Sequence, residues 1–215
     1  MIKVVSMDLE GTLVTLHFSD MVWNVGIPKL YAEQRELTFE DAKRVVFEEY
    51  QKIGDERREW YDINFWFKNL NLKGDWKGLM EAYRGELEVY HEVPEVLKTL
   101  SGRYRLILLS NSSREFIEFE LKALGKGFER VFSATSDFNT VKKSAQVYRM
   151  VCEILGVRPS EIVHVGDHYE SDFLTPRTVG IKSFYLDRSG RTSGEWVVKD
   201  LNEFLERVDR MSSSS

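Results

Sequence analysis

The chain has 215 residues, of which 42% are hydrophobic and 13% aromatic, which suits one large domain or a core domain with a modest insertion. Its formal net charge is −5, from 30 basic and 35 acidic side chains, which excludes general attraction to nucleic acid or to an anionic membrane. We therefore expect a small-molecule partner rather than a polymer. The sequence leaves both a monomer and a homodimer open.

The cellular location is predicted from cysteine content and from the distribution of apolar residues. Cys152 is the only cysteine, so no disulfide can form within the chain, and its apolar neighbours predict a buried structural thiol. Lys3 and Asp8 stand where a secretion signal would need an apolar stretch. No apolar run approaches the roughly 20 residues that span a bilayer. We therefore predict a cytoplasmic protein that makes no use of a membrane.

The first predicted element is a short buried strand at residues 2–7, which ends at Asp8. Residues 16–90 contain no convincing strand pattern. Apolar side chains recur there at helical spacing, as in the stretches 39–50 and 63–70. Four of the five tryptophans lie in this part of the chain. We therefore predict a helical insertion, residues 16–90, after the first strand.

Strands and helices alternate in the rest of the chain. Nearly continuous apolar runs predict buried strands at 105–109, 162–165 and 182–186. Ser112 fits a capping box at the start of one of the helices between them. His164 lies inside a predicted strand and is expected to be a core residue. Connected in this way, the strands form a doubly wound α/β fold with a parallel sheet covered on both faces.

Polar side chains follow three of the predicted strands, namely Asp8, the pair Ser110 and Asn111, and Asp167. Ligands of parallel α/β sheets bind at the carboxyl ends of the strands. Two carboxylates brought together there repel each other unless a cation lies between them, and their hard oxygen atoms favour Mg²⁺. A carboxylate beside a bound phosphate can attack phosphorus and form an aspartyl phosphate. The strand ends therefore predict magnesium-dependent chemistry on a phosphate group.

A phosphoryl transfer also needs groups that stabilise negative charge on the phosphoryl oxygens. Ser110 offers a hydroxyl and the backbone after it offers N–H donors. Lys142 offers a fixed positive charge, and the carboxylate of Asp172 is expected to hold that lysine in place.

Four stretches of the sequence resemble, in order, the motifs of the haloacid dehalogenase (HAD) superfamily. Residues 4–13, an apolar strand followed by Asp-Leu-Glu-Gly-Thr-Leu, resemble the first motif, and Leu-Leu-Ser-Asn at 108–111 resembles the second. The third motif is a lysine with proline after it and tyrosine six residues further on. Lys142 and Tyr148 have that spacing, although Lys143 replaces the proline, so we expect Lys142 to contact the phosphate. Val-Gly-Asp-His-Tyr-Glu-Ser-Asp at 165–172 resembles the fourth motif.

The resemblance covers nearly the whole chain and implies a magnesium-dependent phosphatase that acts on a small phosphorylated metabolite through an aspartyl phosphate. It implies a Rossmann-like HAD core domain at residues 1–15 and 91–211, a helical cap at 16–90 and a flexible tail at 212–215. By this resemblance, Asp8 is the nucleophile and a metal ligand, and Asp167 is a second metal ligand. Glu10 is the acid/base, and its backbone carbonyl is a metal ligand. Ser110, Asn111 and Lys142 bind phosphate or substrate, and Asp172 supports Lys142.

Glu10 departs from the usual aspartate of the first motif. The longer side chain moves the carboxyl group outward by about 1.5 Å, and a misplacement of about 1 Å can cost roughly 100-fold in rate. The enolase-phosphatases of methionine salvage also carry Asp-x-Glu-Gly-Thr, but their second motif differs from this one. The alternatives are a 2-haloacid dehalogenase, a phosphomutase and a HAD-like binding module without turnover. A carboxylate at position 10 argues against the dehalogenase, because those enzymes lack one there.

Overall fold

The structure is a computed structural model that describes residues 1–125 and 127–213. A six-stranded parallel sheet forms its centre, and its strands lie in the order β3-β2-β1-β4-β5-β6. The predicted α/β fold with a doubly wound parallel sheet is therefore confirmed. The strands are β1 (Val4–Met7), β2 (Arg105–Ser110), β3 (Arg130–Ser133), β4 (Ile162–Gly166), β5 (Lys182–Leu186) and β6 (Val197–Val198).

The order of the strands places a switch point at the centre of the sheet. From β1 the chain passes to β2 and β3 on one side, and later to β4, β5 and β6 on the other. Met7 at the end of β1 pairs with Leu108 of β2 and with Val165 of β4. The residues that follow β1 and β4 are therefore neighbours at the carboxyl edge, where ligands of this fold class bind.

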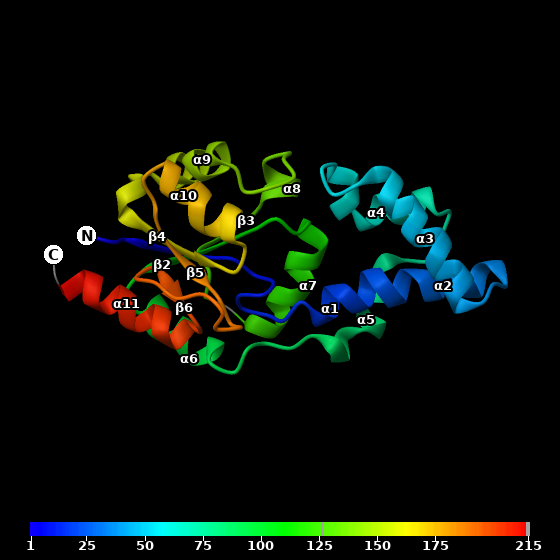
Figure 1. Cartoon of the computed structure of the whole chain (residues 1–215), viewed down its shortest axis with the longest axis horizontal. Helices are drawn as coiled ribbons and strands as arrows, with labels where there is room; N and C mark the ends of the chain where they lie inside the picture. The colour runs from blue at the N-terminus through cyan, green and yellow to red at the C-terminus, as the bar shows by residue number, and fades with distance from the viewer. Residues whose placement is uncertain (126, 214–215) are drawn as a thin grey trace.

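Helices cover both faces of the sheet (Figure 1). Val5 and Met7 of β1 lie in the apolar cluster that contains Leu97 and Phe204, whereas Val4 lies in the opposite cluster with Val151. This alternation follows from the two-residue repeat of a strand. The helices are α6 (Val93–Ser101), α7 (Arg114–Leu124), α8 (Ala134–Asp137), α9 (Ala145–Leu155), η4 (Pro159–Glu161), η5 (Tyr169–Leu174), α10 (Thr175–Thr178) and α11 (Leu201–Ser213).

The C-terminus differs from the predicted tail. Helix α11 continues to Ser213, so residues 212 and 213 are helical, and residues 214 and 215 lie outside the described part of the chain. None of the helices that the structure describes is long and apolar enough to cross a membrane.

The helical insertion lies beyond the carboxyl edge of the sheet (Figure 1). Its helices bury an apolar cluster of their own around Phe18, Val46 and Trp66. Thr38 begins the longest of them, because its hydroxyl accepts a hydrogen bond from the backbone N–H of Asp41 (3.2 Å). The elements are α1 (His17–Met21), η1 (Val22–Gly26), α2 (Ile27–Arg35), α3 (Phe39–Ile53), η2 (Arg58–Tyr61), α4 (Ile63–Asn69), α5 (Trp76–Ala82) and η3 (Arg84–Glu86).

The main contacts between the two parts lie at the connecting segments and along one helix. The segments that enter and leave the insertion run antiparallel at Val14 and Val89, and the Thr15 N–H donates to the carbonyl of Glu88 (2.9 Å). Helix α7 also belongs to both parts. Its Ile117 packs in the sheet cluster, whereas Phe116 and Phe119 pack in the cluster of the insertion. The ring of Phe119 stacks on Phe18 of α1, with centroids 5.0 Å apart.

Candidate active site

The first site residue follows β1 directly. Asp8 is 6% exposed and begins a tight turn in which the N–H of Leu13 donates to the carbonyl of Leu9 (2.7 Å). Gly11 lies in this turn with φ of 77°, and a Cβ atom there would lie 2.2 Å from a carboxylate oxygen of Asp167. Only glycine permits both the backbone conformation and the close approach. The turn therefore brings the carboxyl ends of β1 and β4 together.

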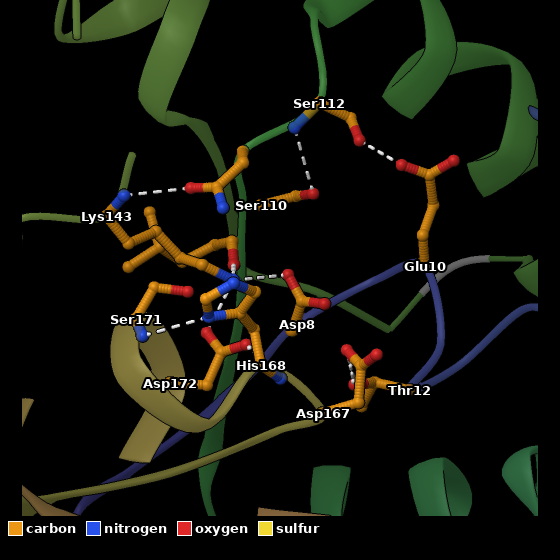
Figure 2. Close-up of polar contacts among 12 residues, drawn as sticks. Asp8, Glu10, Thr12, Ser110, Ser112, Lys143, Asp167, His168, Ser171 and Asp172 are labelled. Carbon is orange, nitrogen blue, oxygen red and sulfur yellow. Dashed lines mark hydrogen bonds and ion pairs between the residues drawn. The ribbon is translucent and has the colours of Figure 1, made fainter. Parts of the chain in front are cut away.

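Three carboxylates gather at this edge. Oxygen atoms of Asp8, Asp167 and Asp172 all lie within 4.8 Å of one another. The hydroxyl of Thr12 faces Asp167 across 3.5 Å (Figure 2). The structure thus brings together the three aspartates that the sequence placed after two different strands. Oxygen donors of this kind fit a hard divalent cation such as Mg²⁺.

The lysine of the site is Lys143 and not Lys142. The Nζ atom of Lys143 lies 2.5 Å from Asp8 Oδ1 and 2.5 Å from Asp172 Oδ1, and its side chain is buried. Lys142 is exposed and pairs with Glu56 of the insertion instead (3.0 Å). The expectation that Asp172 holds Lys142 is therefore wrong.

Two contacts explain which lysine faces the site. The side-chain oxygen of Asn111 accepts a hydrogen bond from the Lys143 N–H (2.8 Å), and Ser144 caps α9 through the N–H of Val147 (3.3 Å). These contacts place Lys143 immediately before the helix with its side chain inward. Tyr148 then follows the site lysine by five residues instead of the six of the family motif. The six-residue spacing therefore selected the wrong lysine.

Asp172 is held by buried polar partners. It is 0% exposed, accepts a hydrogen bond from the N–H of His168 (3.1 Å) and lies 3.1 Å from His164 Nε2. His164 is buried as expected, and its Nδ1 lies 2.8 Å from the hydroxyl of Ser6. Burial lowers the pKa of His164 although Asp172 opposes the shift, which favours the neutral ring.

The charges of the site do not balance. Burial raises the pKa of Asp8 well above its usual value; Lys143 opposes that rise, whereas Asp172 and Asp167 add to it. Burial also raises the pKa of Asp167, with a further contribution from Asp172. Burial disfavours the charge on Lys143, but Asp172 and Asp8 outweigh this effect and raise its pKa. One ammonium group faces three carboxylates, so the site favours an additional cation.

The residues that end the second motif form hydrogen bonds with other parts of the site. Ser110 is 2% exposed, and its hydroxyl accepts a hydrogen bond from the N–H of Ser112 (3.2 Å). Asn111, expected to contact substrate, holds the backbone of Lys143 as described above. The hydroxyl of Ser112 donates to a carboxylate oxygen of Glu10 in a close hydrogen bond (Figure 2). Ser112 therefore does not form the expected capping box, because α7 begins one residue later and Ser113 is its N-cap.

Glu120 was missed in the sequence. It lies on α7, is 0% exposed, and has the carboxyl group of Glu10 as its neighbour. Burial raises its pKa well above the usual value, and the adjacent carboxyl group of Glu10 adds to the rise. The signal was its spacing of four residues from Phe116, which places both on one helix face.

A cavity of about 370 Å³ opens beside Glu10, between the core domain and the helical insertion. Asn111 and Ser112 border it from the core domain, and Asp20 and Asn24 border it from the insertion. Five aromatic side chains complete its walls: Trp23, Tyr50, Trp60, Tyr61 and Phe116.

The chain is similar to several known proteins over most of its length. The glyceraldehyde 3-phosphate phosphatase of Pyrococcus furiosus is 24% identical over 233 aligned positions, covering 99% of this chain and 95% of that protein. The (S)-2-haloacid dehalogenase 4A of Burkholderia cepacia is 29% identical over 177 positions, covering 75% and 73%. The crystal structure of a HAD phosphatase from Thermococcus onnurineus superimposes with a TM-score of 0.82 at 24% identity, covering 96% of this chain and 98% of that one.

These relatives include both a phosphatase and a dehalogenase, so their names alone do not select a reaction. The sequence model of the haloacid dehalogenase-like hydrolases matches residues 2–180, which contain every residue of the site described above. The chain therefore belongs to the haloacid dehalogenase-like hydrolase family.

Proposed function

We propose that this protein is a magnesium-dependent phosphatase that hydrolyses a small phosphorylated metabolite. The observation that carries the proposal is the buried contact of Lys143 with Asp8, beside Asp167 and close to Glu10. A nucleophile, a phosphate-binding cation and a candidate acid/base thus occupy one edge of the sheet.

The reaction follows from the positions of these residues. An oxygen of Asp8 attacks phosphorus, a new P–O bond forms, and the bond to the leaving oxygen breaks. Glu10 donates the proton that the leaving oxygen takes up. Glu10 then accepts a proton from water as that water attacks phosphorus, which releases phosphate and restores Asp8. Lys143 and Ser110 stabilise the negative charge of the phosphoryl oxygens throughout.

The carboxylates of Asp8 and Asp167, with the backbone carbonyl of Glu10, would hold Mg²⁺. The excess of negative charge and the all-oxygen donors support this assignment. When bound, Mg²⁺ supplies positive charge that relieves the repulsion between the carboxylates and polarises the phosphate. Asp172 has another task, because its oxygens already contact Lys143, His164 and the N–H of His168.

The site argues against dehalogenation of a 2-haloacid. Such a substrate carries its own carboxylate, and no lysine or arginine is among the described residues that line the cavity. The carboxylate of Asp20, which lines the cavity, would repel the carboxylate of the substrate. The carboxyl group of Glu10 is instead useful for a leaving oxygen that must gain a proton.

We also propose that the helical insertion is a cap over the site. The cavity supports this, because its walls come from both parts of the molecule. The insertion also reaches the phosphate-binding segment directly, through the ion pair of Glu56 with Lys142. A cap of this kind excludes bulk water during phosphoryl transfer.

Phosphate release from p-nitrophenyl phosphate and from a panel of metabolite phosphates, with Mg²⁺ or with excess chelator, tests the proposal. We expect turnover that requires Mg²⁺ and that disappears in Asp8→Asn. Full activity in chelator would remove the metal from the proposal. Substantial activity of Asp8→Asn would remove the nucleophile.

A further inference from the structure

The cavity beside Glu10 is the place where a leaving group must lie. Glu10 can protonate the leaving oxygen only if that oxygen is within its reach, and Glu10 itself borders the cavity. The volume of about 370 Å³ lies within the usual range of small-molecule sites. The cavity is therefore large enough for a ring system and much larger than a three-carbon leaving group needs.

The half-buried rings of Trp23 and Trp60 supply the aromatic surface of the cavity, since Tyr50 and Phe116 are only 7% and 2% exposed. The ring of Trp23 lies parallel to Phe116, with centroids 5.2 Å apart and an interplanar angle of 19°. Tyr50 meets Trp60 edge to face at 5.8 Å, and its hydroxyl is bound to the carbonyl of Trp23 (3.1 Å). Contacts between these rings hold their positions without a ligand. Preformed aromatic walls stack on a flat ring at little cost in side-chain entropy.

The polar groups of the cavity suit an uncharged ligand. Glu10 and Asp20 are the charged side chains among its described lining residues, and both are acidic. Asn24 and Asn111 offer amide groups that can bind hydroxyls or ring nitrogens. The indole N–H groups of Trp23 and Trp60 have no hydrogen-bond partner among the described residues, so each remains able to donate. A second phosphate or a carboxylate would find no compensating cation here.

We infer that the cavity receives an uncharged leaving group that contains a flat ring and hydroxyls, so that the substrate class is nucleoside 5′-monophosphates. This inference rests on the proposed phosphatase function. Stacking of the base on the aromatic walls provides selectivity over sugar phosphates. The acidic lining rejects substrates with a second anionic group.

Three probes separate the contributions to selectivity. Adenosine 5′-monophosphate and ribose 5-phosphate differ only in the base, and adenosine 3′,5′-bisphosphate adds one phosphate. We expect kcat/KM for the monophosphate to exceed that for ribose 5-phosphate at least about tenfold, the size of one base–aromatic stack. We expect the bisphosphate to be a poorer substrate than the monophosphate by a similar factor. Equal kcat/KM for the monophosphate and ribose 5-phosphate would overturn the inference while leaving the phosphatase intact.

Two variants tie the selectivity to the cavity. Trp60→Leu should reduce the preference for adenosine 5′-monophosphate over ribose 5-phosphate to below about threefold. Trp76→Leu is the matched control, because Trp76 is half-buried in the same insertion and does not line the cavity. Asp20→Lys, at an exposed position, should raise kcat/KM for the bisphosphate relative to the monophosphate. An unchanged preference in both cavity variants would contradict the inference.

A binding measurement distinguishes failure of this inference from failure of the proposed function. Quenching of tryptophan fluorescence by adenosine, with ribose as the control, reports on the cavity without turnover. Adenosine quenching that Trp60→Leu weakens shows that the cavity binds the base, and if no phosphate ester is hydrolysed it is the proposed function that fails. Absence of adenosine binding together with turnover of p-nitrophenyl phosphate refutes the inference and keeps the phosphatase.

Discussion

The catalytic edge of the sheet and the helical insertion share one cavity, but different forces hold their side chains. At the sheet edge, buried charges contact one another directly, as Lys143 does with Asp8 and Asp172. On the insertion side, uncharged aromatic rings pack against one another, as Trp23 does with Tyr50. Changes at the edge should therefore alter the reaction itself, whereas changes in the aromatic walls should alter which substrate reacts.

The largest expected effect tests the edge at its nucleophile. Asp8→Asn should lower turnover by more than about 10⁴-fold, because an amide oxygen is a poor nucleophile. The same change removes one of three mutually repelling carboxylates and leaves the contact of Lys143 with Asp172 in place. Without added metal, we therefore expect a melting temperature equal to or above that of the wild type. A large loss of stability would mean that Asp8 is structural.

Glu10→Gln should lower turnover of an alkyl phosphate by about 10²–10⁴-fold, the range for lost acid–base catalysis. The loss should be smaller for p-nitrophenyl phosphate, whose leaving group needs little help from an acid. Fold and metal binding should persist, because the backbone carbonyl is unchanged. Rates measured for both esters check this; equal activity of variant and wild type on the alkyl phosphate removes Glu10 from the mechanism.

The two adjacent lysines provide a matched pair. Lys143→Met should lower turnover by about 10²–10³-fold, as for loss of one donor to a developing anion. It should also destabilise the fold by about 3–5 kcal/mol, because Asp172 keeps a buried charge without its partner. Lys142→Met should change neither quantity appreciably, since Lys142 is exposed. Urea denaturation and initial rates measure both; a larger effect of Lys142→Met would reverse the assignment.

The buried acid on α7 should affect only the stability of the fold. Unfolded Glu120 loses its proton near its ordinary pKa of about 4.3, whereas burial raises its pKa in the folded state. Between those two pKa values the folded state binds the additional proton, so stability falls as pH rises, by up to about 1.4 kcal/mol per pH unit. Glu120→Gln removes this loss.

We therefore expect Glu120→Gln to be more stable than the wild type at pH 8, with the difference fading toward pH 4. Urea denaturation at several pH values measures it. Glu118→Gln is the control, because Glu118 is an exposed residue of the same helix. A difference that grows as pH falls would show that Glu120 is charged in the folded protein.

The sequence predicted most of the sheet, because β1, β2, β4 and β5 are apolar runs with nearly every residue buried. It missed β3 and β6 at the two edges. Strand β3 begins at exposed Arg130, and β6 has only two residues. Edge strands this short carry too few buried side chains to produce a periodic signal.

The sequence predicted those site residues whose place follows directly from the end of a strand. Asp8 and Asp167 each follow a central strand, and the parallel register brings them together. The lysine was mistaken because neighbouring Lys142 and Lys143 differ only in their direction, which Asn111 determines through a hydrogen bond. Glu120 was overlooked because charged residues usually lie on the exposed face of a helix. The cavity walls depend on packing between helices, which spacing alone does not specify.

Helix α7 packs in both the sheet cluster and the cluster of the insertion, which limits how the insertion can be exchanged between proteins. Phe116 and Phe119 complete the apolar cluster of the helical insertion although they lie outside residues 16–90. A chimera that receives only a foreign segment 16–90 would leave these two rings against a surface shaped for other neighbours. In evolutionary terms, the unit that can be inherited or transplanted intact is the insertion together with one face of α7. A lineage that acquires a new specificity by replacing this insertion must therefore also change a helix that covers the sheet.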